Sequence, residues 1–345
     1  MSDGRLNRID RAKWPSWLLG GAMLAAVIVA GLHFSEGRNI YHLARNARPS
    51  WLLVALFLQA ATYLFQGEIW RIVTRAVGEP LALRTAYWLS LAKLSVDQLL
   101  PSAGISGSLL MVKALEQRGF PRPVVMAGVA VDTASCYATY VLGLGAALVI
   151  TLVHHQANGL VLFASIPFAA GGIGVTVAVL VLSGRRAGAV AKNIARVGPV
   201  RRVLQFFAAA DRGLVRRPAL LLEASACQLA ILLIDAGTIW VLIAALGPTA
   251  TPTSVFASFM ISTLFRIVGF VPGGLGAFEA ASVLTLKAIG VGVPVALAAT
   301  LLFRGLSFWL PMLPGLWFAR RAVGQRRGRQ AHHRDDETNR AAPQH

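Results

Sequence analysis

Long apolar runs are the feature that most constrains the fold of this chain. A helix that crosses a bilayer needs about 20 mostly apolar residues. Six segments meet this requirement: 16–34, 50–70, 122–153, 158–183, 218–246 and 292–319. Charged residues make up only 14% of the sequence, against about 25% in an ordinary soluble domain. The sequence therefore predicts an all-α polytopic membrane protein and excludes the soluble, disordered and fibrous classes.

The positive charge of the chain indicates its orientation in the membrane. A formal net charge of +18 can signal a nucleic-acid partner, but here the cations cluster between apolar runs, as they do in cytoplasmic loops. They gather in the N-terminal segment 1–15, in the loop 184–217 with nine cations against one acid, and in the tail 320–345 with seven arginines. We expect these segments to be cytoplasmic, the tail to be disordered, and the protein to lie in a bacterial cell (inner) membrane without binding nucleic acid.

Two further apolar stretches, 82–100 and 253–288, contain Gly, Pro and charged residues that a plain span would not hold. Tracing the chain between the cytoplasmic loops requires residues 82–119 to leave and return on the cytoplasmic side and residues 253–290 on the external side. We predict a re-entrant or interrupted helical hairpin at each, in addition to about six full spans. The trace places residues 35–49 outside although they hold three arginines, which is a minority violation of the rule.

An internal repeat supports this pair of hairpins. Pro101 is followed 18 residues later by Gly119, and Pro272 is followed at the same distance by Gly290. The two segments read PSAGISGSLLMVKALEQRG and PGGLGAFEAASVLTLKAIG, and they share a valine and a leucine at equal offsets. A chance alignment of Gly/Pro-rich loops is the alternative, but the trace and the spacing agree independently.

The repeat divides a transmembrane domain at 16–319 into two units, 50–153 and 218–319, which would have opposite orientations in the membrane. We therefore predict an inverted repeat. Paired interrupted segments at corresponding positions of inverted halves point to a transport site near the middle of the bilayer.

Candidate substrate-binding residues gather at the second hairpin, where Pro272, Gly273, Gly274 and Gly276 precede Glu279. Glycines behind a proline let the backbone turn tightly and leave amides and carbonyls free. Such irregular backbone survives at membrane depth only when it is buried in protein or lines a wet cavity. Glu279 begins the next helix, whose dipole favours a charged carboxylate there. The alternative is a helix-start residue that merely caps its own amides.

Two arginines are the cationic candidates. Arg304 lies twelve residues into the span 292–319, where an ionisable side chain is a functional-site hypothesis by default. Its expected partner is Glu279 or an anionic head group, because the planar guanidinium suits phosphate. A structural ion pair with Glu279 is the alternative. Arg266 precedes the Pro-Gly-Gly turn and either faces the substrate or reaches the external interface.

The first hairpin offers Lys93 and Asp97, which are four residues apart and therefore share a helical face. They precede Pro101, Gly104 and Gly107, the residues of the first glycine turn that we expect at the substrate site. Lys93 either attracts a phosphate at the cytoplasmic entrance or forms a local salt bridge with Asp97.

Signatures of catalysis are missing from the sequence. It has no nucleotide-binding motif, no Cys or His set at metal-ligand spacing and no nucleophile elbow. Asp132 and Asp235 lie within spans and are weaker candidates, either for proton relay or for hydrogen bonds between helices. We expect no enzyme activity, no cofactor and no metal.

With these segments in view, the chain resembles the lysylphosphatidylglycerol-synthase transmembrane family, also called flippase-like membrane proteins. The resemblance covers roughly residues 15–320. It rests on Leu-Pro-Ser-x-Gly-x-x-Gly at 100–107, Pro-Gly-Gly-x-Gly-x-x-Glu at 272–279 and Arg304 in Leu-Phe-Arg. The first motif is closer to hopanoid-associated and stand-alone members than to the aminoacyl-lipid ones. Many relatives place an acidic residue after the first glycine turn, where this chain has Gly107, Ser108 and Met111.

The resemblance implies translocation of a lipid or lipid-linked substrate between leaflets, with the head group held between the two hairpins. Larger members carry a cytoplasmic domain that adds lysine to phosphatidylglycerol. Because this chain continues only about 25 residues past its last span, we expect no such domain. Membrane lipids and lipid-biosynthesis enzymes are the expected partners. The alternatives are a membrane scaffold that transports nothing itself, and a secondary transporter of small solutes or ions.

Overall fold

The computed structural model describes residues 48–99, 105–153, 170–174, 176–177, 210–268, 274–315 and 317–318, and over these residues the secondary structure is all-helical. Four helices are long and apolar enough to cross a membrane: α4 (Pro49–Arg75), α7 (Arg122–Val153), α12 (Pro218–Ala245) and the continuous helix Val293–Gly315. The last of these consists of α15 (Val293–Arg304), a π-helical turn η3 (Gly305–Trp309) and a final α-helical stretch.

These four helices coincide with the spans predicted at 50–70, 122–153, 218–246 and 292–319. The prediction of a polytopic all-α membrane protein is thereby confirmed for the described part of the chain. The span predicted at 16–34, most of the span at 158–183 and most of the basic loop lie outside the described residues, as do both terminal segments.

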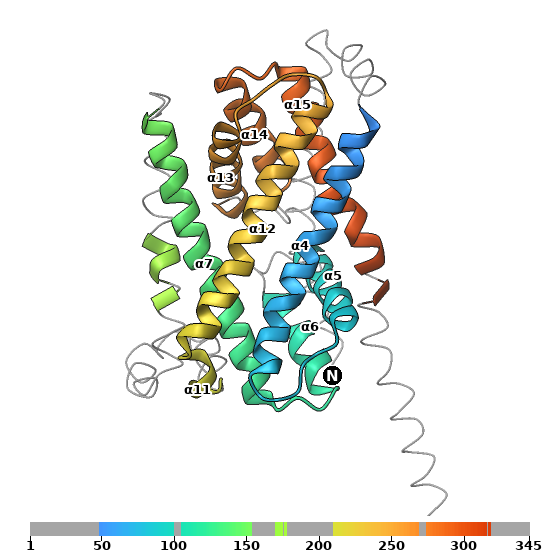
Figure 1. Ribbon diagram of the computed structural model, residues 1–345, viewed down its shortest axis with the longest axis vertical. Coiled ribbons are helices and arrows are strands. Elements are labelled where there is room, and N and C mark those ends of the chain that lie inside the picture. Colours follow the sequence, from blue (N-terminus) through green and yellow to red (C-terminus); the bar gives the residue numbers. More distant parts are fainter. Residues whose placement is uncertain are drawn as a thin grey trace, which may run out of the picture.

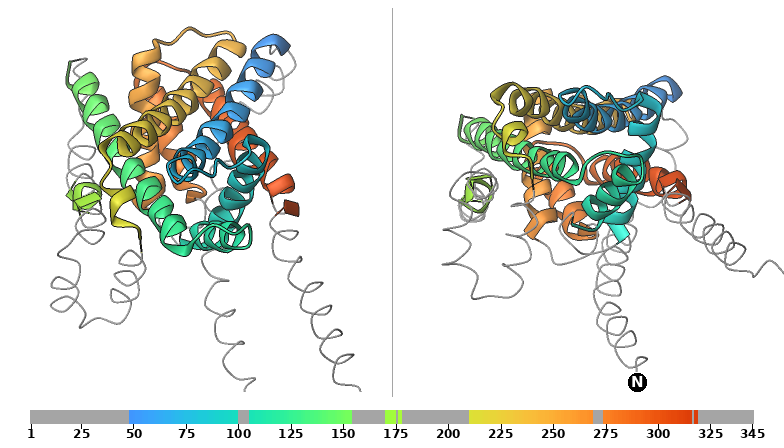
Figure 2. Two further views of the ribbon diagram at one scale, coloured as in Figure 1. Left: turned by 60° about the horizontal axis from the view of Figure 1, so that its bottom comes forward. Right: turned by 90° about the horizontal axis from the view of Figure 1, so that it is seen from below.

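Two antiparallel long helices form one edge of the bundle. The backbone N–H of Arg48, at the start of α4, donates to the carbonyl of Ala245, at the end of α12, over 3.1 Å. The two helices lie side by side both in the side view of the bundle (Figure 1) and in the view from below (Figure 2). Pro49 and Pro218 each occupy the first turn of their helix, where the missing N–H of proline costs no helical hydrogen bond.

Both interrupted stretches fold as pairs of short helices. The first pair is α5 (Leu83–Leu99) with α6 (Ile105–Glu116), and the second is α13 (Pro252–Val268) with α14 (Ala277–Ala288). The helices of each pair measure 17 and 12 residues. A 12-residue helix is only about 18 Å long, which is too short for a hydrocarbon core of about 30 Å.

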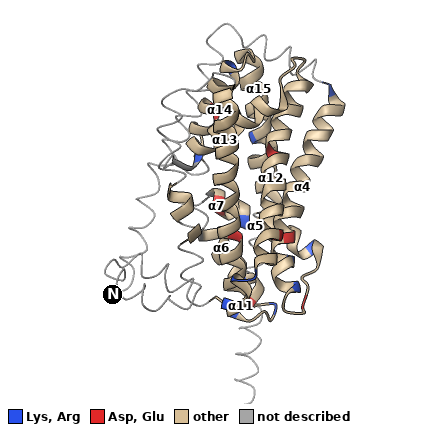
Figure 3. Cartoon of the chain, turned by 60° about the vertical axis from the view of Figure 1, so that its left-hand side comes forward, with Lys and Arg blue, Asp and Glu red and all other residues tan. Residues whose placement is uncertain are grey.

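The two hairpins occupy opposite ends of the bundle (Figure 1). The N–H of Asp211, just before α11 (Arg212–Val215), donates to the carbonyl of Pro123 at the start of α7. Because α6 directly precedes α7, the α5–α6 hairpin lies towards the end of the bundle that carries α11. Basic residues gather at this end (Figure 3). The α13–α14 hairpin lies at the other end, beside the start of α15.

The short second helices of the hairpins end in the same way. Gly119 and Gly290, which the repeat pairs with each other, have φ angles of +93° and +90°. The N–H of the residue after each glycine donates to the carbonyl five positions earlier: Phe120 to Leu115 over 3.2 Å, and Val291 to Leu286 over 3.0 Å. This is the Schellman ending, in which glycine supplies the left-handed conformation. The leucines matched by the repeat therefore hold equivalent structural positions.

Polar and apolar side chains are distributed as expected for helices in lipid. Large apolar side chains point outward, such as Phe57 at 71% and Leu142 at 73% exposure. Buried polar side chains face the interior and include Gln59, Thr62, Ser90, Asp132, Gln228, Thr238, Ser262, Glu279, Thr300 and Arg304. Polar groups in a membrane protein need partners inside the bundle because lipid offers none.

Candidate functional site

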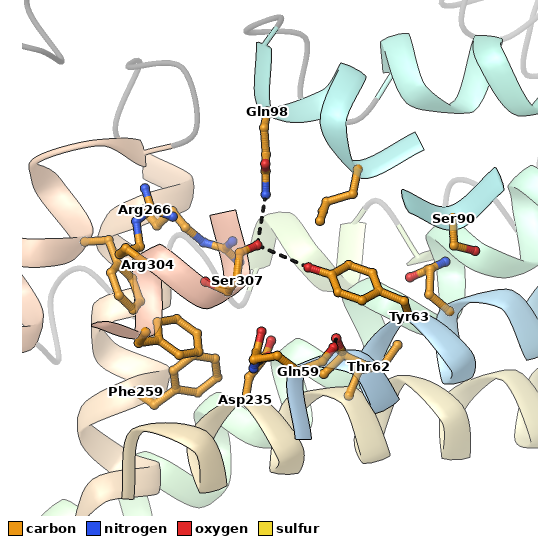
Figure 4. A pocket seen from close by; sticks show the side chains of 15 residues that line it. Gln59, Thr62, Tyr63, Ser90, Gln98, Asp235, Phe259, Arg266, Arg304 and Ser307 are labelled. Carbon is orange, nitrogen blue, oxygen red and sulfur yellow. Dashed lines mark hydrogen bonds between the residues drawn. The ribbon is translucent and has the colours of Figure 1, made fainter. Parts of the chain in front are cut away.

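A cavity of about 110 Å³ lies inside the bundle between the two hairpins (Figure 4). It is lined by Gln59, Thr62, Tyr63 and Gln66 of α4, Ser90, Leu94 and Gln98 of α5, Ile231 and Asp235 of α12, Phe259 and Arg266 of α13, Phe278 of α14, and Phe303, Arg304 and Ser307 of the α15–η3 helix. A single water needs about 10–15 Å³, so the cavity has room for several waters or for a small polar group.

Glu279 and Arg304 form a buried ion pair at the second hairpin. Arg304 Nε donates to Glu279 Oε1 over 2.6 Å, and the two side chains are 6% and 0% exposed. The other carboxylate oxygen, Oε2, accepts the N–H of Gly276 over 2.6 Å and so caps α14. The pairing agrees with the partner expected for Arg304. The capping described as the alternative role of Glu279 is also present.

The guanidinium of Arg304 reaches the cavity while its carboxylate partner lies behind it. Aromatic rings enclose the group, with its Cζ atom 5.4 Å from the centre of the Phe278 ring and 4.7 Å from that of Phe308. Such cation–π contacts stabilise a desolvated cation by about 2 kcal/mol. Arg304 lines the cavity and Glu279 does not, so the carboxylate positions the arginine.

Arg266 is the second cation of the cavity and comes from the end of α13. Its Nη2 donates to the hydroxyl of Tyr140 over 3.2 Å. Its Nε is buried and has no hydrogen-bond partner among the described residues. Gly274, with a φ of +64°, packs so closely on Arg266 that a Cβ there would overlap the arginine side chain. The missing side chain at Gly274 therefore leaves the space that the Arg266 side chain occupies.

Asp235 supplies a negative charge to the same cavity. Its Oδ1 accepts a hydrogen bond from Gln59 Nε2 over 2.9 Å, and the same amide nitrogen lies 3.0 Å from Thr238 Oγ1. Asp235 was predicted only as a weak candidate, and the structure places it opposite the two arginines of the cavity (Figure 4).

The π-helical turn after Arg304 supplies a backbone acceptor. Ser307 O accepts hydrogen bonds from Tyr63 of α4 over 3.3 Å and from Gln98 of α5 over 3.4 Å. A π-helical turn disturbs the regular i→i−4 bonding of the backbone, and this carbonyl instead joins α15 to the first hairpin.

The first hairpin holds its own charged cluster, next to the cavity. Lys93 Nζ lies 3.3 Å from Asp132 Oδ2 and 3.8 Å from Asp97 Oδ2. The expected salt bridge with Asp97 is therefore present, but the closer partner of Lys93 is Asp132 of α7. Asp97 also accepts the N–H of Gly107 over 2.7 Å. Neither Lys93 nor Asp97 lines the cavity.

The structure thus brings Arg266 and Arg304 together at the cavity. Gly274 packs against Arg266, and Glu279 pairs with Arg304 and accepts the N–H of Gly276. Lys93, Asp97 and Gly107 lie at the opposite hairpin. The remaining predicted site residues, Pro101, Gly104, Pro272 and Gly273, lie outside the described residues.

Sequence reasoning missed the glutamines of the cavity. Gln59 and Gln66 of α4 are seven residues apart, which places them on one helical face, and both line the cavity. Gln228 and Asp235 of α12 have the same spacing. A pair of polar residues at this spacing inside an apolar span is the signal that could have identified them.

Comparison with known proteins places the chain in a family. The sequence model of the lysylphosphatidylglycerol synthase TM region matches residues 17–315. The chain belongs to this family. A 64-residue segment is also 39% identical to the phosphatidylglycerol lysyltransferase of Staphylococcus haemolyticus (strain JCSC1435), a match that covers 19% of this chain and 8% of that protein.

As a member of the lysylphosphatidylglycerol synthase TM family, the chain is a membrane protein, and its family is connected with membrane lipids. Among the residues that the structure describes, no three His, Cys, Asp or Glu side chains gather as metal ligands would.

Proposed function

We propose that this protein is a translocator that moves a lipid or lipid-linked substrate between the leaflets of a bacterial cell membrane and catalyses no covalent reaction. The observation that carries the proposal is the polar cavity between the two hairpins, which bears two arginines at membrane depth. A lipid head group would occupy this cavity while its acyl chains remain among the outward apolar side chains of the helices.

The arrangement of the helices supports alternating access. In sequence order, a long helix, a 17-residue helix, a 12-residue helix and a long helix occur twice, first as α4 to α7 and then as α12 to α15. The first long helices of the two series are antiparallel, and the hairpins lie at opposite ends of the bundle. An inverted repeat of this kind permits the two halves to exchange conformations around a central site. The basic residues of segments 1–15 and 320–345 place both termini on the cytoplasmic side in this proposal.

The charges of the cavity favour a head group that contains phosphate. Arg266 makes its observed hydrogen bond to a neutral tyrosine hydroxyl, so its charge remains available to an anion. Arg304 already neutralises Glu279 and adds a positively polarised surface beside it. Asp235 stands opposite and can receive an ammonium group, so the cavity suits a zwitterionic or anionic phospholipid better than a neutral glycolipid.

The proposal is tested by leaflet exchange in proteoliposomes of the purified protein, with labelled anionic, zwitterionic and neutral lipids. We expect exchange of the phosphate-containing lipids, and a loss of at least about tenfold in Arg266→Gln, which corresponds to about 1.4 kcal/mol. Arg75→Gln is the matched control, because Arg75 is half-exposed, pairs with Glu68 at the end of α4 and does not line the cavity.

Other outcomes distinguish the rival functions. Folded protein that exchanges no lipid contradicts translocation and favours a scaffold for a lipid-modifying enzyme. Uptake of a water-soluble substrate without lipid exchange favours a solute transporter.

A further inference from the structure

The cluster of Lys93, Asp97 and Asp132 contains one base and two acids within the bundle. Their side chains are 17%, 16% and 8% exposed. With all three groups ionised the cluster has a net charge of −1. A net charge buried in an apolar surrounding is costly, and such a group takes up a proton or a counterion instead.

The hydrogen bonds of the two acids differ. Asp132 Oδ1 accepts from Gln66 Nε2 and from Gln228 Nε2, each over 3.0 Å, and its Oδ2 faces Lys93. A carboxylate with donors on both oxygens is stabilised in its charged form. Asp132 is therefore the closer ion-pair partner of Lys93 in the cluster.

Asp97 has a different environment on its two oxygens. Its Oδ1 accepts the N–H of Gly107 over 2.7 Å and lies 3.4 Å from the hydroxyl of Ser106. Its Oδ2 is 3.8 Å from Lys93 Nζ, which is beyond hydrogen-bond distance. A proton on Oδ2 would neutralise the cluster without breaking the bond of Oδ1 to α6.

Among the described residues, the other elements around Asp97 place no second base in contact with it. Helix α7 contributes the Cys136 thiol one turn after Asp132, and this thiol lies within electrostatic reach of Asp132, Lys93 and Arg266 of α13. Helices α4 and α12 present the amides of Gln66 and Gln228, and α6 presents Ser106 and the Gly107 N–H.

We propose that Asp97 is a proton-binding site and that substrate movement is coupled to protons through it; the second half of this inference rests on the proposed function. Ionised, Asp97 attracts Lys93 and holds the first turn of α6 through Gly107. Protonated, it releases Lys93 to Asp132 and weakens its bond to α6, because a neutral acid is a poorer acceptor than a carboxylate.

The cluster is linked to the substrate cavity through two residues. Gln66 donates to Asp132 and also lines the cavity. Gln98 follows Asp97 directly, lines the cavity and donates to Ser307 O of the π-helical turn. A shift at Asp97 therefore reaches the cavity wall, and proton uptake on one side can favour opening of the first hairpin.

Protonation is tested directly by infrared difference spectroscopy across a pH titration of the protein in lipid nanodiscs. We expect a carboxylic-acid C=O stretch that is absent from Asp97→Asn and retained in Glu68→Gln. The Asn amide oxygen can still accept from Gly107, so the hairpin keeps its anchor. Glu68 is a partly exposed acid of α4, paired with Arg71 and Arg75, and serves as the matched control. A wild-type difference spectrum that Asp97→Asn leaves unchanged overturns the proton site, because bands from the other acids within the bundle, such as Asp235 and Glu279, remain in both proteins.

Coupling is tested in the same proteoliposomes with a pH gradient. One proton per substrate and a gradient of one pH unit sustain at most about a tenfold asymmetry of the substrate between leaflets. We expect such an asymmetry for wild type and Glu68→Gln and none for Asp97→Asn. Wild-type exchange that ignores the gradient overturns the coupling and leaves the proposed function intact. If no lipid is exchanged, the proposed function and its coupling both fail, while the infrared titration still decides the proton site.

Discussion

The ion pair of Glu279 and Arg304 offers a quantitative test of how the second hairpin is held. Both side chains are almost completely buried, and Glu279 makes two charge-assisted hydrogen bonds of 2.6 Å. Removing one partner of such a pair leaves an uncompensated buried charge and costs about 3–5 kcal/mol. Glu279→Gln keeps the size of the side chain and an oxygen for the Gly276 N–H, so the loss that it causes measures the charge.

The double-mutant cycle isolates the interaction. If the two sites were independent, Glu279→Gln and Arg304→Met together would cost about 6–10 kcal/mol, the sum of the single losses. We expect the double variant to cost no more than either single variant, because no charge is then left unpaired, and the coupling energy to be at least about 3 kcal/mol.

The assay is the free energy of unfolding from reversible denaturant titration in mixed micelles. Glu68→Gln is the control, because its partly exposed pairs with Arg71 and Arg75 should contribute less than about 1 kcal/mol each. Additive losses in the double variant would refute the assignment of Glu279 as the residue that neutralises Arg304.

Two further predictions concern packing and capping. Gly107→Ala is expected to lower the unfolding free energy by about 1–3 kcal/mol, because a Cβ there would lie 2.5 Å from Lys93 O and overlap Asp97. The control Gly145→Ala, with no atom within 4 Å of the new Cβ, should be neutral or slightly stabilising. Equal losses at both sites in thermal unfolding would contradict the close approach of α5 and α6. Asp211→Ala is expected to lower the unfolding free energy by about 1 kcal/mol, since Asp211 Oδ1 accepts the N–H groups of Gly213 and Leu214 at the start of α11. Asp211→Asn keeps a capping oxygen and should retain most of this stability in the same assay. An Asn variant as unstable as the Ala variant would argue against the cap.

Much of the fold is readable from the sequence because hydropathy and helix-terminal signals are local. The four described spans follow from apolar runs, and the two interruptions follow from Gly, Pro and charge inside apolar stretches. Even the ends of α6 and α14 are marked by Gly119 and Gly290, whose positive φ angles need no distant contact. The pairing of Glu279 with Arg304 was also predictable, since each is an isolated charge at membrane depth that requires a partner.

The tertiary structure alone decided which polar groups meet. Nothing local indicates that Lys93 pairs more closely with Asp132 than with Asp97, or that glutamines from α4 and α12 converge on the same carboxylate oxygen. The cavity itself depends on the placement of both hairpins against α4, α12 and α15. Sequence patterns report which side chains cannot face lipid, whereas their partners depend on helix packing across more than a hundred residues of chain. For this protein, the sequence by itself determined the membrane class, the described spans and the interrupted segments, and packing decided the cavity and the charge pairs around it.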